Sequence, residues 1–144
     1  MKKWMLGFGL MMAVSSISYG AAMQSLDKSK VTKFFENHTM TTVSMITLNG
    51  KMVNNTFTGY LAKDGKIVGQ LAAKSGNLPQ GDKGTWTVKD NGEFCVTWEH
   101  WQEAKQTCMD VYETKNMLIF VNVATGKFES AVPLEHLKDG DQMS

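Results

Sequence analysis

The chain has 144 residues, 42% of them hydrophobic and 20% charged, which fits one domain built around one hydrophobic core. Its 15 cationic side chains are all lysines and are almost balanced by 14 acidic ones. The balance excludes the basic surface that nucleic-acid binding needs, and the lack of arginine argues against bidentate phosphate recognition.

The first 22 residues have the three-part pattern of a secretory signal peptide. Lys2 and Lys3 form a cationic head, residues 4–14 are an apolar run, and residues 15–22 are small and weakly polar. An apolar run of about eleven residues is too short to span a bilayer as a helix. We therefore expect residues 1–22 to be removed and residues 23–144 to form one β domain, exported to the bacterial periplasm or exterior, without an integral membrane segment.

A single short amphipathic helix is expected over residues 26–37. Ser25 and Asp27 supply start signals, and the apolar residues that follow recur at helical spacing. We expect its apolar stripe to pack on the core, because a membrane-surface helix would need a stronger cationic face. The stripe consists of Leu26, Val31, Phe34 and Phe35.

From residue 39 to residue 134 the hydrophobic period changes to two and turn signals become frequent. The dipeptides Asn49-Gly50 and Asn91-Gly92 are strong hairpin signals, because both central residues of such turns must tolerate positive φ. Asp64-Gly65 and Thr125-Gly126 add further turns. The pattern predicts a mainly β fold, an antiparallel meander of about eight strands that closes into a small barrel or folds as a sandwich, followed by a short C-terminal tail.

Cys95 and Cys108 are the two cysteines of the chain, and in an exported protein we expect them to form a disulfide. If they lie opposite each other in a hairpin, Phe94 faces Met109 and large apolar side chains collect on the other face. A reactive or metal-binding thiol pair is disfavoured, because no Cys-x-x-Cys motif or neighbouring histidine is present.

The tip of this hairpin holds the densest group of functional side chains. It contains two carboxylates, an imidazole and an indole ring, and the same residue types serve in acid–base catalysis and metal binding. We expect a solvated loop in which Trp101 is exposed as the anchor of a recognition surface. The candidate tip residues are Glu99, His100, Trp101, Gln102 and Glu103.

Each histidine stands close to a glutamate, but the three pairs are spread along the chain without a ligand spacing. We expect isolated surface histidines, no metal site and no cofactor, because no nucleophile elbow, phosphate-binding loop or zinc-helix motif occurs. The pairs are Glu36 with His38, Glu99 with His100, and Glu135 with His136.

Aromatic residues in the predicted strands alternate with polar ones, as side chains facing a core do. In a barrel that its side chains do not fill, the same rings would line a cavity for a small apolar ligand. These candidates for core or cavity are Trp86, Phe94, Trp98, Phe120 and Phe128.

The order of Gly84-Thr85-Trp86, Cys95, Trp98 and Cys108 resembles a family of short exported bacterial proteins that carry a domain of unknown function. The resemblance covers residues 57–134 and implies export and a disulfide. Gly84-Thr85-Trp86 also resembles the Gly-x-Trp signature of lipocalins, which implies a ligand-binding barrel, although lipocalins carry that signature on their first strand.

These observations leave three classes of function. The first is a non-catalytic interaction protein of the bacterial envelope or exterior, whose partner is an unknown protein. The second is a lipocalin-like carrier or sensor of a small apolar ligand inside a barrel. The third is an enzyme with an unrecognised site, for which no catalytic residue can be named.

Overall fold

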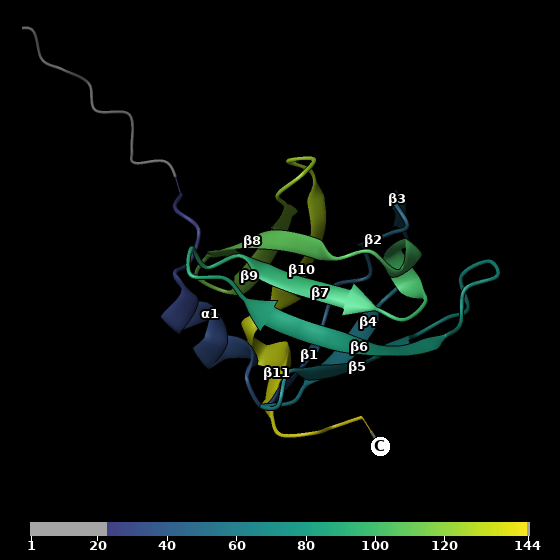
Figure 1. Cartoon of the computed structure of the whole chain (residues 1–144), viewed down its shortest axis with the longest axis horizontal. Coiled ribbons are helices and arrows are strands. Elements are labelled where there is room, and N and C mark those ends of the chain that lie inside the picture. Colours follow the sequence, from purple (N-terminus) through teal and green to yellow (C-terminus); the bar gives the residue numbers. More distant parts are fainter. Residues whose placement is uncertain (1–22, 144) are drawn as a thin grey trace, which may run out of the picture.

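The computed structural model describes residues 23–143, so the predicted signal peptide lies outside the described residues. Within these residues the fold consists of one α-helix and eleven short strands (Figure 1), which confirms the predicted mainly β class. No helix in the described part of the chain is long and apolar enough to cross a membrane.

The helix α1 spans Lys28–Phe35 and is shorter than the predicted 26–37. It begins where the Asp27 side chain accepts a hydrogen bond from the Lys30 amide at 2.9 Å, a typical N-cap. It ends before Asn37, whose left-handed φ of 58° reverses the chain into the first strand. Val31 and Phe35 are its fully buried residues.

Nine strands form one antiparallel sheet in the order β10-β9-β8-β7-β6-β5-β4-β1-β11, and β2 pairs with β3 in a separate hairpin. Seven of the nine are joined to the next strand along the chain in a simple meander from β4 to β10. The strands are β1 (His38–Thr41), β2 (Ile46–Leu48), β3 (Lys51–Val53), β4 (Phe57–Leu61), β5 (Lys66–Leu71), β6 (Gly81–Val88), β7 (Phe94–Trp98), β8 (Thr107–Glu113), β9 (Met117–Asn122), β10 (Phe128–Pro133) and β11 (Leu137–Asp139).

The two ends of this sheet come together, so the sheet nearly closes into a barrel. β10 and β11 are separated only by a short 3₁₀ turn, η2 (Leu134–His136), yet β10 pairs with β9 while β11 pairs with β1. A further hydrogen bond joins the extension of β1 to β10, from the Val43 amide to the Ala131 carbonyl at 2.9 Å. The predicted meander and barrel are confirmed, and closure leaves few free strand edges.

The first segment of the predicted β region, before the Asn49-Gly50 turn, is divided between β1 and β2. The chain leaves the sheet after Thr41 and returns as the β2–β3 hairpin, which lies at the end of the barrel away from α1 (Figure 1). Asn49 and Gly50 form its turn with φ of 50° and 78°, as their sequence predicts. The hairpin is held to β10 by a hydrogen bond from Thr47 Oγ1 to the Phe128 carbonyl at 3.1 Å.

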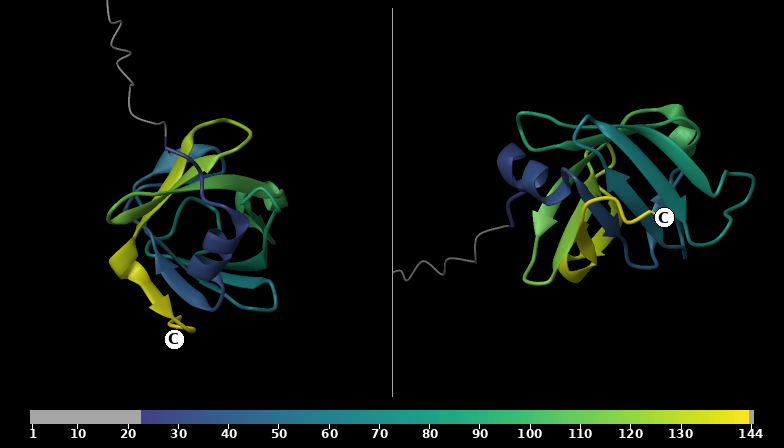
Figure 2. Two further views of the ribbon diagram at one scale, coloured as in Figure 1. Left: turned by 90° about the vertical axis from the view of Figure 1, so that its left-hand side faces the viewer. Right: turned by 90° about the horizontal axis from the view of Figure 1, so that it is seen from below.

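The helix closes one end of the barrel. Seen along the barrel, α1 stands across the ring of strands (Figure 2). The Phe35 ring lies 4.8 Å from the Phe94 ring and 5.6 Å from the Phe120 ring, centre to centre, so the helix packs directly on aromatic residues of β7 and β9. The opposite end carries the β2–β3 hairpin and the turn that follows β7 (Figure 1).

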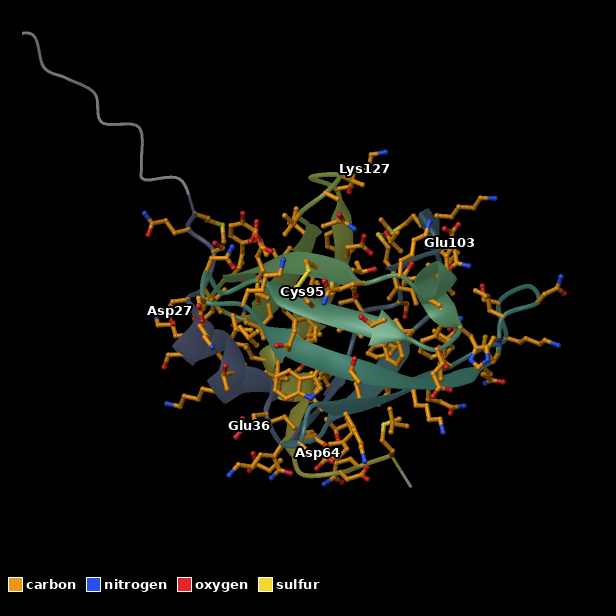
Figure 3. The ribbon with its side chains drawn as sticks, viewed as in Figure 1. Asp27, Glu36, Asp64, Cys95, Glu103 and Lys127 are labelled. Carbon is orange, nitrogen blue, oxygen red and sulfur yellow. A yellow bond between two sulfur atoms is a disulfide. The ribbon has the colours of Figure 1, made fainter. Side chains whose placement is uncertain are left out.

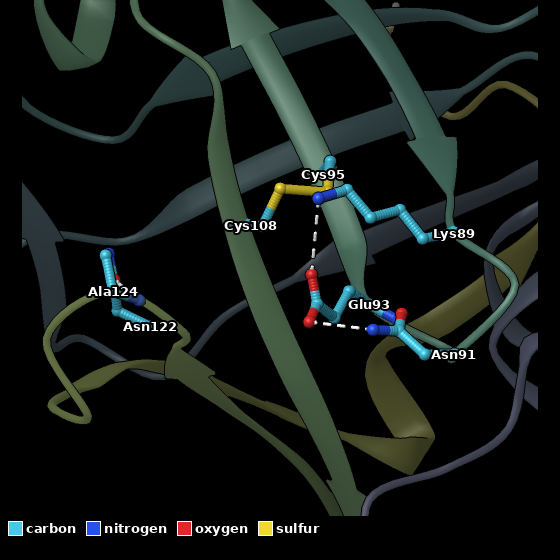
Figure 4. The surroundings of a disulfide bond; sticks show 7 residues. All are labelled: Lys89, Asn91, Glu93, Cys95, Cys108, Asn122 and Ala124. Carbon is cyan, nitrogen blue, oxygen red and sulfur yellow. Dashed lines mark hydrogen bonds and ion pairs between the residues drawn. A yellow bond between two sulfur atoms is a disulfide. The ribbon is translucent and has the colours of Figure 1, made fainter.

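The predicted disulfide between Cys95 and Cys108 is present, and its two residues are direct partners in the β7–β8 pairing (Figure 4). Phe94 faces Met109, as the proposed register requires. Near it, Lys89 and Glu93 form an ion pair of 3.5 Å. The bond therefore links two neighbouring strands at the middle of the sheet.

Candidate functional site

An apolar pocket of about 100 Å³ lies in the barrel interior, toward the end covered by the β2–β3 hairpin. Half-buried polar residues, Gln102, Thr107 and Ser130, join its lining, so the pocket reaches the molecular surface. Its apolar walls are formed by Met40, Ile46, Leu48, Phe57, Ile67, Leu71, Phe94, Val96, Trp98, Trp101, Met109 and Phe120.

Three aromatic rings form one wall of this pocket. The centres of the Trp98 and Trp101 rings are 4.7 Å apart, and Phe57 packs edge-on against both at 5.7 and 6.1 Å. They meet over Gly69 of β5, where an added Cβ would lie 2.6 to 2.8 Å from all three rings. Glycine at this position therefore lets the rings approach the backbone, and the wall has a fixed shape.

The other aromatic candidates divide between pocket and core. Phe94, Trp98 and Phe120 are buried and line the pocket, whereas Trp86 is buried outside it and donates its indole N–H to the Ala62 carbonyl at 2.9 Å. Phe128 is half-buried and does not belong to the pocket lining.

The expectation that Trp101 is exposed is wrong. Its side chain is 1% exposed, and its indole nitrogen donates to the Pro79 carbonyl at 2.8 Å. The reason is the backbone of the 3₁₀ turn η1 (Trp101–Ala104), in which Gln102, Glu103 and Ala104 all have left-handed φ of 54° to 57°. This tight reversal turns the ring inward while its charged neighbours stay in water.

The remaining tip residues occupy the outer side of the turn. Glu99, His100 and Glu103 are exposed, and Gln102 is half-buried. Glu103 lies at the end of the molecule opposite Asp27, the N-cap of α1 (Figure 3). The tip therefore keeps its charged surface but has lost the aromatic anchor on which the predicted recognition surface depended.

A buried carboxylate fixes the start of the turn. Asp82 of β6 accepts hydrogen bonds from the amides of His100 at 2.8 Å and Trp101 at 2.9 Å, and its other oxygen contacts His100 Nδ1 at 3.0 Å. Burial by itself raises the pKa of Asp82, but these hydrogen bonds outweigh it and lower the pKa below its ordinary value of 3.8. Asp82 is therefore held ionised as the support of the Trp101 backbone.

Asp82, Glu99 and His100 also offer three potential metal-ligating atoms within 4.8 Å of one another. Both Asp82 oxygens already accept hydrogen bonds from the turn. These bonds account for the close approach of the three residues, so we assign no metal to them. A second such group, Glu93 with Cys95 and Cys108, has its sulfurs in the disulfide. Within residues 23–143 the three histidines do not gather into one group.

The side chain of Gln102 ties the turn to the β2–β3 hairpin. Its side-chain Oε1 accepts from the Asn49 backbone amide at 2.8 Å and its Nε2 donates to the Thr47 carbonyl at 3.1 Å, while the backbone amide of Gln102 donates to Asn49 Oδ1 at 2.7 Å. Both segments contribute to the pocket lining. These three hydrogen bonds therefore fasten together the two covers of the open barrel end.

Glu129 is the residue that sequence reasoning missed. Its position in β10 coincides with a shift in the pairing with β9, between Phe128 and Ser130, so two successive side chains, Glu129 and Ser130, both reach the pocket. Glu129 is 8% exposed and accepts a hydrogen bond from Asn122 Nδ2 at 2.8 Å. Such a bulge breaks the two-residue period, and strict alternation would have placed Glu129 outside.

The environment of Glu129 disfavours its charge. Burial raises the pKa of the carboxyl above its ordinary value of 4.5, although the hydrogen bond from Asn122 offsets part of the effect. Glu129 is the one ionisable side chain among the described residues that line the pocket. The site thus combines an apolar chamber with a single carboxyl group.

A second hollow, of about 670 Å³, lies between α1 and β11, and it differs in chemistry. Its lining mixes three lysines and His38 with two acids, and the His38 ring is already paired with Asp139 at 2.9 Å. It contains no buried polar group that points to a ligand. We therefore regard the interior pocket as the candidate site.

Comparison of the chain with family models, curated proteins and solved structures finds no match. The resemblance to short exported bacterial proteins accordingly stays a prediction.

Proposed function

We propose that this protein is a non-catalytic binding protein, a carrier or sensor that holds a small apolar ligand in its barrel. The observation that carries the proposal is the apolar pocket at the open end. Its walls are aromatic and aliphatic, with few polar groups, which is the common composition of ligand pockets. The alternative of a protein-recognition tip has lost its support, because Trp101 is 1% exposed.

The size of the pocket limits the ligand. A pocket of about 100 Å³ is smaller than those that enclose drug-sized molecules, which start at about 300 Å³. An apolar cavity of about 150 Å³ holds benzene. The enclosed part of the ligand is therefore a group of about four to six heavy atoms, and any longer portion projects through the open end.

Binding of benzene, followed by NMR chemical shifts of the backbone amides, tests the proposal. Benzene should shift amides of the pocket strands and saturate. Thr107 lines the pocket, so Thr107→Phe should fill it and weaken binding at least about tenfold. Thr85 is exposed on β6, so Thr85→Phe should change nothing. Absence of saturable binding, or equal weakening by both variants, would contradict the proposal.

We further propose that the protein works in the periplasm or outside the bacterium. The Cys95–Cys108 disulfide supports this location, because such bonds persist in oxidising compartments. Mass spectrometry of protein from the exported fraction should show a chain that begins at Ala21 or Met23. Protein that retains residues 1–22 and stays in the cytoplasm would overturn this part of the proposal.

A further inference from the structure

One oxygen of the buried Glu129 carboxyl has no hydrogen-bond partner among residues 23–143. Oε1 accepts from Asn122 Nδ2 at 2.8 Å, but Oε2 accepts from no described donor. No fully buried side-chain nitrogen or oxygen in the described chain lacks a partner, so Oε2 must be accessible, and Glu129 belongs to the lining of the pocket. A side chain that is 8% exposed and lines an apolar chamber thus keeps one acceptor without a partner among the described residues.

A largely buried carboxyl of this kind destabilises the folded protein unless a ligand supplies a hydrogen-bond donor or a positive charge. Burial in an apolar setting disfavours a carboxylate that has neither a full set of hydrogen bonds nor an opposite charge beside it. The pocket contributes no lysine or histidine that could neutralise Glu129. Three polar neighbours in the lining are engaged elsewhere: Gln102 with Asn49 and Thr47, Thr47 with the Phe128 carbonyl, and Ser130 with the Met45 carbonyl.

From this geometry we infer that the pocket is specific for apolar amines, whose ammonium group donates to Glu129 Oε2 while the hydrocarbon part fills the space beside Trp98, Phe94 and Phe120. The inference rests on the proposed function and specifies its ligand. The ammonium would supply both the missing hydrogen-bond donor and the missing opposite charge. The aromatic rings in the lining of the pocket favour a cation further.

The competing ligand classes fit the same chamber less well. An alcohol can donate to Oε2 but leaves the charge of Glu129 uncompensated. A carboxylate would place a second negative charge against the first in an apolar enclosure. Probes that share one hydrocarbon chain and differ only in the polar group therefore distinguish amines, alcohols and carboxylates as ligands.

Three probes with the same four-carbon chain, n-butylamine, 1-butanol and butyrate, test the inference on the purified exported protein. Dissociation constants come from NMR titrations at neutral pH. Butylamine should bind at least about tenfold more tightly than butanol, as a charge-assisted hydrogen bond allows, and butyrate should bind least. This comparison uses the wild-type protein and needs no variant to fold.

Glu129→Gln keeps the shape of the side chain and removes the charge. It should bring the affinity for butylamine to within about twofold of that for butanol, with butanol binding retained. Glu103→Gln is the matched control, because Glu103 carries the same charge on the exposed side of η1 and its side chain is 66% exposed. This control should keep the preference of the wild type.

The outcomes separate this inference from the proposed function. If the wild type binds butanol as tightly as butylamine, or if Glu129→Gln keeps the preference, the amine inference is wrong while a general apolar site stands. If none of the three probes and no benzene binds, both proposals fall.

Discussion

Glu129 shows how one residue can set the chemistry of an otherwise hydrocarbon chamber. A bulge in β10 places its carboxyl inside, where burial raises its pKa. Asp82 shows the opposite case, because backbone amides of η1 surround its carboxyl and lower its pKa. Two buried acids in one small barrel thus differ because one has its hydrogen bonds complete and the other does not.

Glu129 should make the stability of the protein depend on pH. Because its pKa is higher in the folded than in the unfolded chain, the folded state holds the proton more tightly, and the stabilisation is complete below the ordinary value of 4.5. It is lost as the pH rises through the raised pKa of the folded state. Glu129→Gln has no carboxyl to ionise, so it does not lose stability in this way. The free energy of unfolding of the variant minus that of the wild type should therefore be greater at pH 7.5 than at pH 4.

Urea unfolding at the two pH values measures the effect, with the exposed Glu103→Gln as control. Glu103→Gln should stay at a constant offset from the wild type. The contradictory result is a difference in the free energy of unfolding between Glu129→Gln and wild type that is equal at the two pH values or larger at pH 4. Such a result would show that folding does not disfavour the ionised form of Glu129.

Among the elements, η1 departs furthest from what its sequence predicts. Left-handed φ at three successive residues that are not glycine costs roughly 1 to 2 kcal/mol each. The burial of Trp101, its hydrogen bond to Pro79, the amides held by Asp82 and the Gln102–Asn49 contacts offset this cost. The turn is therefore a consequence of tertiary packing.

Trp101→Ala should destabilise the protein by about 3 to 5 kcal/mol, as the loss of a large buried aromatic ring does. The variant Trp101→Phe keeps a ring but loses the hydrogen bond to the Pro79 carbonyl, so it should cost less. Thermal or urea unfolding distinguishes the two. A Trp101→Ala variant as stable as wild type would mean that the ring lies on the surface.

The pairing of β7 with β8 has the register and the disulfide that the sequence predicts. Replacing both Cys95 and Cys108 with serine should lower stability by about 2 to 4 kcal/mol, because the unfolded chain regains freedom in the closed loop. The fold should persist, since the strands also pair through their backbones. Circular dichroism and urea unfolding under identical conditions measure both effects, and an unfolded double variant would show that the bond is needed for the barrel itself.

Sequence reasoning succeeded where one local rule acts alone. Asn49-Gly50 and the Cys95–Cys108 register depend on turn chemistry and two-residue alternation, and both have the predicted form. It failed where distant contacts override the local rule. The bulge at Glu129 depends on how β10 meets both β9 and the β2–β3 hairpin, and the inward turn of Trp101 depends on Asp82, 19 residues away.

In the whole molecule, the closure of the sheet and the elements at the two ends of the barrel determine where a ligand can enter. The meander joins its ends through β10, η2 and β11, and α1 stands across one mouth of the ring (Figure 2). The other mouth carries the β2–β3 hairpin and η1, which Gln102 fastens together. Residues of both segments line the pocket, which therefore lies at this end of the barrel.

The central claim is that the barrel interior contains an accessible apolar chamber, and a crystal structure of the protein pressurised with xenon tests it most directly. Xenon enters apolar cavities of this kind. We expect a xenon atom in the pocket, between Trp98 and Phe120 and within reach of Glu129. A pocket filled by its own side chains, or xenon found only elsewhere, would contradict it.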